Sequence, residues 1–284
     1  MIRLSESSLG DLVLLDDPFV VTSLQIGAPA VRGVMRNRAL ANGAFDDTRF
    51  TGSRAVTIGL RLNTKECGGA TIQALIDSLA PYTVPRRRCV LSWSLPGSPE
   101  LERAMVVRGE GLPVEITAPK YTVLQTQWVA PDGEIVSPSE TCQIIDPSGD
   151  TEDGRTYDLT FDRVYPPSAG IGDRIITQNG NEDAHWRATI FGPCEDPFLR
   201  VNGVTIKLTG LTLNSGSNVQ IDTRARTIYR NGDPTQSDYA LTNYAVWAWA
   251  DLMLHPGGNL VRYGADVLGV GSTVQFCWRD SYAA

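Results

Sequence analysis

Histidine is almost absent from this sequence of 284 residues, which contains only His185 and His255. The two are far apart in the chain, and each is next to residues typical of turns. A histidine-dependent catalytic triad or metal cluster would have to be assembled from these two residues alone. We therefore interpret both as surface histidines at turns, not as parts of an active site.

Other catalytic signatures are also missing. The sequence has no G-x-x-x-x-G-K-[ST] phosphate-binding loop and no G-x-S-x-G nucleophile elbow. Asp16-Asp17 and Asp46-Asp47 are adjacent pairs, so in a strand their members would point to opposite faces. A glycosidase instead needs two carboxylates that face each other across about 5–10 Å. The acidic stretch 146–154 lacks the ligand order of a calcium-binding EF-hand. We therefore expect no enzyme activity, no metal and no cofactor.

Long apolar runs are absent as well. No segment approaches the roughly 18–20 continuous apolar residues that span a membrane, and the first residues do not form an apolar stretch behind a basic start. We expect folding in a cytoplasm and no membrane partner. The cysteines are odd in number, scattered and without a C-x-x-C spacing, which favours buried free thiols. They are Cys67, Cys89, Cys142, Cys194 and Cys277.

The overall composition is that of an ordinary globular protein, with 42% hydrophobic and 20% charged residues. The formal net charge of −7 argues against a general nucleic-acid binder, which is usually basic. At about 100–200 residues per domain, the length favours two domains. A polar, proline-bearing connection places the boundary near residue 134, giving domains 1–134 and 135–284. A second candidate boundary is 166–170.

Alternation of apolar and polar residues dominates the chain and predicts strands. It is clearest at 56–62, at 123–129, at 157–161 and at 273–279. Asn-Gly and Asp-Gly pairs recur between such segments, and both tolerate the positive φ of tight hairpin turns. Many short strands with this punctuation indicate β-sandwiches or barrels.

One helix interrupts this pattern. Between residues 70 and 79, Ile72, Leu75, Ile76 and Leu79 have the i, i+3, i+4, i+7 spacing of one helical face. Pro81 is expected to end the helix, because proline cannot continue the backbone hydrogen bonding. A single amphipathic helix in a β-rich domain is expected to cover one face of a sheet.

Arginine is concentrated around the segment 42–47. One interpretation is a surface loop with internal ion pairs. The other is a subunit interface, where arginine is enriched and carboxylate pairing fixes the register. In the second case Arg49 and Arg54 would pair with Asp46 or Asp47 of a neighbouring copy. The further arginines of the cluster are Arg32, Arg36 and Arg38, and the interface candidates among them are Arg36 and Arg38.

Several motifs of the C-terminal half point to one family. They are a Trp186–Phe198 block with a Gly-Pro turn, the Ile-Asp-Thr strand 219–223, a Pro-Gly-Gly-Asn hairpin at 256–259 and a closing Trp-Arg strand at 278–279. Together they resemble the distal tail proteins, a class of minor tail proteins, of long-tailed non-contractile bacteriophages. The resemblance covers most of the chain and is strongest from residue 185 onwards.

This resemblance implies a mainly β protein with two parts. Residues 1–134 would form a tail-tube-like β-sandwich or barrel with one short α-helix, and residues 135–284 a galectin-like β-sandwich. Such proteins form a ring, usually hexameric, that joins the tail tube to the tip or baseplate and the receptor-binding apparatus. DNA passes through the ring without specific binding. The implied partners are further copies of the chain, the tail tube protein, the tape measure protein and other tail-tip proteins. The implied location is the virion tail tip, after synthesis in the host cytoplasm.

A second hypothesis is a carbohydrate-binding β-sandwich that contacts host cell-wall glycan. Trp247 and Trp249 would then be exposed and stack on sugar rings, as Trp186 also could. The alternative for these residues is the hydrophobic core, where large aromatic side chains usually lie.

Overall fold

The computed structural model divides the chain into two compact units, Met1–Pro138 and Ser139–Ala283. The sequence placed the domain boundary near residue 134. Within these units, only the backbone is described at 31–32, 35–37, 44–46, 50–51, 63, 72, 114–118 and 121–122. The structure describes residues 1–14, 19–32, 35–37, 44–46, 50–63, 72–98, 100–111, 114–118, 121–147, 172–242 and 252–283.

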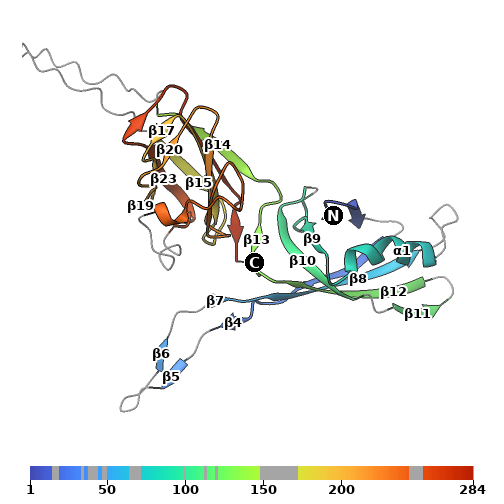
Figure 1. The fold of residues 1–284 in the computed structure, drawn as a ribbon. Helices are drawn as coiled ribbons and strands as arrows, with labels where there is room; N and C mark the ends of the chain where they lie inside the picture. The colour runs from blue at the N-terminus through green and yellow to red at the C-terminus, as the bar shows by residue number, and fades with distance from the viewer. Residues whose placement is uncertain are drawn as a thin grey trace, which may run out of the picture. The chain divides into compact units, whose positions relative to one another are not determined.

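The first unit is built on one antiparallel sheet with the strand order β2-β1-β9-β10-β12-β8-β3 (Figure 1). The predicted alternation at 56–62 is confirmed, because Val56, Ile58, Leu60 and Leu62 are all buried on one face of β8. The short strands β11 (Val114–Ala118) and β13 (Ile135–Val136) join β12 and β10. The main strands are β1 (Ile2–Glu6), β2 (Gly10–Leu14), β3 (Phe19–Ile26), β8 (Arg54–Asn63), β9 (Arg88–Trp93), β10 (Arg103–Gly111) and β12 (Tyr121–Ala130).

Helix α1 (Ile72–Thr83) lies against β8, β10 and β12, as expected for a helix that covers one face of a sheet (Figure 1). Leu75 and Leu79 are buried at this contact. The prediction that Pro81 ends the helix is wrong, because the helix continues to Thr83. Pro81 lies in the last turn, where its missing N–H costs one hydrogen bond without preventing the chain from completing the turn.

A two-stranded ribbon continues β3 and β8 beyond the sheet. Backbone hydrogen bonds between residues 27 and 55 and between 30 and 53 lead into β4 (Val31–Arg32), which pairs with β7 (Phe50–Thr51). Further out, β5 (Met35–Asn37) pairs with β6 (Ala44–Asp46). Among the described residues no third strand joins either pair, and the ribbon runs away from the sheet (Figure 1).

The second unit is a β-sandwich. Its sheets have the orders β14-β25-β16-β21-β22 and β15-β23-β18-β19, and a small sheet β20-β17-β24 flanks them. Buried residues of both larger sheets form one hydrophobic core. The strands are β14 (Thr141–Ile145), β15 (Gly172–Gln178), β16 (Trp186–Phe191), β17 (Cys194–Glu195), β18 (Phe198–Val201), β19 (Val204–Lys207), β20 (Thr212–Leu213), β21 (Asn218–Asp222), β22 (Thr227–Arg230), β23 (Gly257–Gly264), β24 (Val267–Leu268), β25 (Thr273–Trp278) and β26 (Ser281–Tyr282), with a short 3₁₀ helix at Tyr239–Leu241.

The closing strand β25 shows the predicted alternation, with Val274, Phe276 and Trp278 buried in the core. Trp186 on the neighbouring strand β16 stacks on Phe276 with ring centroids 4.9 Å apart. Trp186 is therefore a core residue, and it offers no exposed ring to a sugar. The predicted strand at 157–161 lies outside the described residues.

The expectation of free cysteines is wrong for one pair. Cys142 in β14 and Cys277 in β25 are register partners with Cα atoms 4.1 Å apart, and their sulfur atoms form a disulfide. Cross-strand neighbours without mutual hydrogen bonds approach this closely. Cys89 and Cys194 are buried free thiols, as expected, and burial raises the pKa of both. Cys67 lies outside the described residues.

The Pro-Gly-Gly-Asn segment is not a hairpin turn, which corrects the sequence interpretation. Gly257, Gly258 and Asn259 are already the first residues of β23. Asn259 is completely buried and donates hydrogen bonds to the carbonyls of His255 and Gly257, at 2.8 and 2.9 Å. Its Oδ1 accepts from the His255 amide at 2.8 Å. The asparagine therefore anchors the entry to the strand.

The described residues contain no helix that is both long enough and apolar enough to cross a membrane.

Candidate subunit interface

The structure describes only part of the predicted interface cluster. Arg38, Asp47 and Arg49 lie outside the described residues. Arg36 and Asp46 belong to the distal part of the ribbon, where β5 and β6 pair. In the described part of the chain, β5 and β6 pair only with each other. The pairing of Arg36 and Asp46 with a neighbouring copy stays a prediction.

Arg54 has a different environment from the one expected. It lies at the base of the ribbon, is 7% exposed, and its Nε donates to the Gly133 carbonyl oxygen at 2.6 Å. Gly133 has a φ of +64°, and a Cβ there would collide with the Gly52 carbonyl oxygen. Arg54 therefore fixes the turn after β12 to the start of β8 within its own chain. The pairing of Arg54 with Asp46 or Asp47 of a neighbouring copy stays a prediction.

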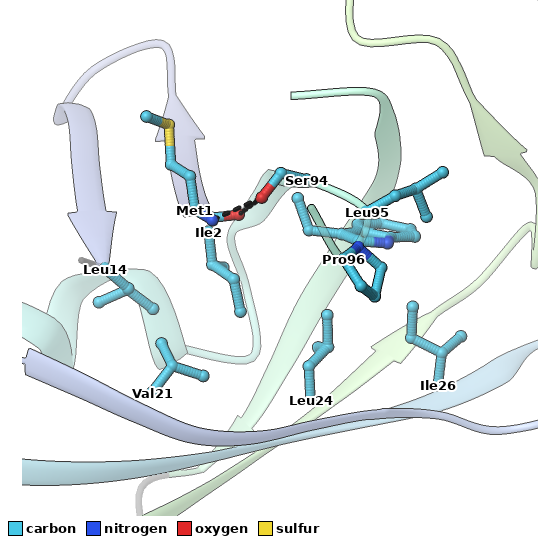
Figure 2. Close-up of a pocket in the computed structure, with 10 residues that line it drawn as sticks. Met1, Ile2, Leu14, Val21, Leu24, Ile26, Ser94, Leu95 and Pro96 are labelled. Atoms are coloured by element: carbon cyan, nitrogen blue, oxygen red, sulfur yellow. Dashed lines mark hydrogen bonds between the residues drawn. The ribbon is translucent and has the colours of Figure 1, made fainter. Parts of the chain in front are cut away.

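An apolar hollow of about 590 Å³ lies in the first unit and was not foreseen from the sequence. Figure 2 shows β3 side chains pointing towards the start of β1 and the loop after β9 across this space. Where the structure describes the lining, its polar groups are the Ser94 hydroxyl, the Trp93 indole and the amino group of Met1. The lining residues are Met1, Ile2, Leu14, Val21, Leu24, Ile26, Trp93, Ser94, Leu95 and Pro96.

Four strands of the sheet contribute side chains to the hollow: β1, β2, β3 and β9. Of these, β2 and β3 stand at the two ends of the strand order. A β-bulge between Val21 and Ser23 shifts the register of β3 against β8. After the bulge, Leu24 and Ile26 lie on the same face as Val21, so the strand presents an apolar row to the hollow.

Two polar contacts fix the mouth of the hollow. The Met1 amino group donates to Ser94 Oγ at 2.5 Å, and the Ser94 amide donates to the Met1 carbonyl at 2.9 Å (Figure 2). Met1 is 46% exposed and Leu95 is 36% exposed, so apolar side chains reach the surface. Among the described residues, the lining holds no carboxylate side chain, imidazole or thiol. This mostly apolar arrangement suits contact with another protein segment.

Sequence reasoning missed the hollow because its lining residues come from segments far apart in the chain. The alternation in β3 was also disguised, since the bulge breaks the period-2 pattern after Val21. The two tryptophans proposed for glycan binding, Trp247 and Trp249, lie outside the described residues.

No protein-family model matches the sequence, and no curated protein matches it. Among solved structures, the Dit protein of phage SPP1 aligns at a TM-score of 0.59 with 10% identity, covering 99% of both chains. That protein is described as a paradigm of the hub adsorption apparatus in phages that infect Gram-positive bacteria. A chain of the phage P2 baseplate in its activated, calcium-bound conformation aligns at 0.45 with 8% identity, covering 98% of this chain and 97% of that one. The SPP1 likeness confirms the expected mainly β fold: this chain has the fold of a phage Dit hub protein.

Proposed function

We propose that this protein is a structural component of a phage tail tip, built into the adsorption apparatus as a hub. The observation that carries the proposal is the full-length likeness to the SPP1 Dit protein, which extends over both units. The mostly apolar lining of the hollow among the described residues supports a role in assembly.

The protein would act as a ring, hexameric by the family resemblance, at the junction between the tail tube and the tip. A ring needs head-to-tail contacts, in which two different surfaces of one copy meet those of the next. The first unit offers two such surfaces. One is the apolar hollow between the unpaired ends of the sheet, and the other is the ribbon β4–β7. An isolated two-stranded ribbon is only marginally stable in water, so a neighbouring copy would stabilise it.

The ring would surround the DNA path, with the tail tube protein, the tape measure protein and other tip proteins as partners. The net charge of −7 supports a channel that does not retain DNA, because protein–DNA affinity is dominated by basic groups that contact phosphates. The galectin-like second unit would hold the other tip components.

Electron microscopy of the purified chain and of virions tests this proposal. We expect six-fold rings, and monomers alone in both samples would contradict it. The surface is tested with Leu24→Lys, which places a charge in the apolar hollow, against Gln25→Lys, which places the same charge on the exposed neighbouring position. We expect Leu24→Lys to abolish rings and Gln25→Lys to preserve them, with unfolding curves recorded for both. Rings that survive a folded Leu24→Lys variant would exclude the hollow from the interface.

A further inference from the structure

The outer face of the sheet β15-β23-β18-β19 in the second unit combines exposed aliphatic side chains with arginine. Ile175 of β15 and Leu260 of β23 are register partners. They are 71% and 48% exposed, although both belong to strands whose other faces enter the core. Two aliphatic side chains side by side on a sandwich surface form an apolar patch that water covers in the isolated chain.

Two arginines stand beside this patch on the same face. Arg262 of β23 and Arg200 of β18 are register partners, so like charges lie directly opposite each other, which is an unfavourable arrangement. Asp173 neutralises Arg262 through two hydrogen bonds of 2.6 Å, and these bonds lower the pKa of the carboxyl. Arg200 has no acidic partner among the described residues. Its Nε donates to the Gly203 carbonyl at 3.2 Å.

A rigid turn holds this arrangement in place. Asn202 and Gly203 connect β18 to β19 with φ values of +48° and +91°, the signature of a tight two-residue hairpin turn. Asn202 exchanges hydrogen bonds with the backbone of Leu260, at 3.0 and 3.2 Å, and donates to Asn259 Oδ1 at 2.6 Å. The result is a preformed hollow of about 180 Å³ lined by Arg200, Gly203, Leu260 and Arg262.

The charged and aliphatic side chains that line this hollow indicate which kind of ligand it could bind. The Arg200 guanidinium has no acidic partner among the described residues, and the Arg262 guanidinium beside it is neutralised by Asp173. This pair fits a carboxylate, because arginine binds carboxylates through paired N–H donors. The adjoining Leu260 and Ile175 add an aliphatic contact. Arginine next to exposed apolar side chains is typical of protein interfaces. The described residues that line the hollow include no aromatic ring on which a sugar could stack, which favours a protein ligand over a glycan.

We propose that this face binds a partner protein segment that presents a carboxylate side chain beside an aliphatic one. The carboxylate would lie between Arg200 and Arg262, and the aliphatic side chain would pack on Leu260 and Ile175. The proposal deepens the tail-tip function and rests on it only for the expectation that the second unit holds other proteins.

The test uses the full chain and the arginine Nε–H signals of its ¹⁵N NMR spectrum, assigned with Arg200→Gln and Arg262→Gln. The probe is the peptide acetyl-Leu-Asp-Leu-amide, and its control is acetyl-Leu-Asn-Leu-amide, which has the same shape without the charge. We expect the aspartate peptide to shift the Arg200 and Arg262 signals saturably below about 10 mM. Binding should be at least about tenfold weaker for the asparagine peptide and for the Arg200→Gln protein. Arg226→Gln, which removes an exposed arginine elsewhere in the same unit, should leave it unchanged.

Three results would overturn the proposal: no shift of these signals, equal shifts with both peptides, or equal binding by Arg200→Gln. Tetragalacturonate is titrated in parallel as an acidic glycan. If it binds at these arginines more tightly than the peptide, the ligand is a glycan and the proposal is wrong. Microscopy of the same Arg200→Gln sample separates this site from the proposed function, since rings should persist in it. Loss of peptide binding with intact rings identifies the site, and absence of rings in the unmodified chain contradicts the tail-tip assembly alone.

Discussion

Replacing the buried Asn259 with alanine should destabilise the start of β23, because the Asn259 side chain holds the backbone there. Four hydrogen bonds of its side chain are shorter than 3.0 Å: two donated to carbonyls of His255 and Gly257, and two accepted from the His255 amide and Asn202 Nδ2. At about 1 kcal/mol net for each bond, their loss costs about 4 kcal/mol. His255 and Gly257 are exposed, so water can replace some of the lost hydrogen bonds. We therefore expect Asn259→Ala to destabilise this region by about 2–4 kcal/mol.

The measurement is hydrogen exchange of the full chain, read in peptides that cover β15 and β23. A loss of about 2–4 kcal/mol corresponds to amide protection reduced by roughly 30- to 1,000-fold where opening of this region limits exchange. The matched control is Asn214→Ala, an exposed asparagine in the same unit whose side chain makes no hydrogen bond within the described structure. A change below about threefold, or one equal to that of the control, would show that Asn259 does not anchor the strand.

Three further predictions concern packing, redox state and charge. Gly109→Ala should destabilise the first unit by about 1–3 kcal/mol in thermal unfolding, because the new Cβ would overlap the last backbone carbonyl of α1, whereas Gly258→Ala, whose Cβ meets one side-chain atom at 3.4 Å, should be nearly neutral. Oxidised protein, denatured without reductant, should titrate three thiols, two fewer than the five cysteines of the sequence, and a count of five would exclude the disulfide. In an NMR pH titration, Asp173 should have a pKa below the ordinary aspartate value, because Arg262 hydrogen-bonds its charged form. Its stabilising effect is then present above the unfolded-state pKa and lost as the pH falls through the folded one. Arg262→Gln should move the pKa back up, and no movement would refute the assignment.

Much of the fold was predictable because its signals are local. The alternation at 56–62 and 273–279 depends only on which face of a strand is buried. Both segments form strands, and the residues expected to be buried are buried. The helix was found from its apolar spacing, although its end was placed too early at Pro81. Proline usually ends a helix, but Pro81 lies in the last turn of α1, and the helix continues to Thr83.

The candidate sites were not predictable, because they depend on which strands become neighbours. Cys142 and Cys277 are 135 residues apart, and only the register of β14 against β25 brings them together. In the same way, Arg200 and Arg262 become a pair only through the pairing of β18 with β23. The composition of the arginine cluster likewise did not show that the Arg54 side chain is buried, because that depends on the turn after β12 that lies beside it.

The β-bulge in β3 shows how one extra residue changes which side chains a strand presents on one face. Without the bulge at Thr22, strict alternation from Val21 would turn Ser23 and Gln25 towards the hollow and Leu24 to the opposite face. The bulge needs room on β8, where a Cβ at Gly59 would lie 2.6 Å from the Ser23 hydroxyl oxygen and 2.8 Å from that of Thr22. The bulge and this glycine together give the end strand of the sheet a continuous apolar row that its own chain leaves partly uncovered. Partly uncovered apolar side chains of this kind are unfavourable in an isolated chain, and under the proposed function a neighbouring copy would cover them.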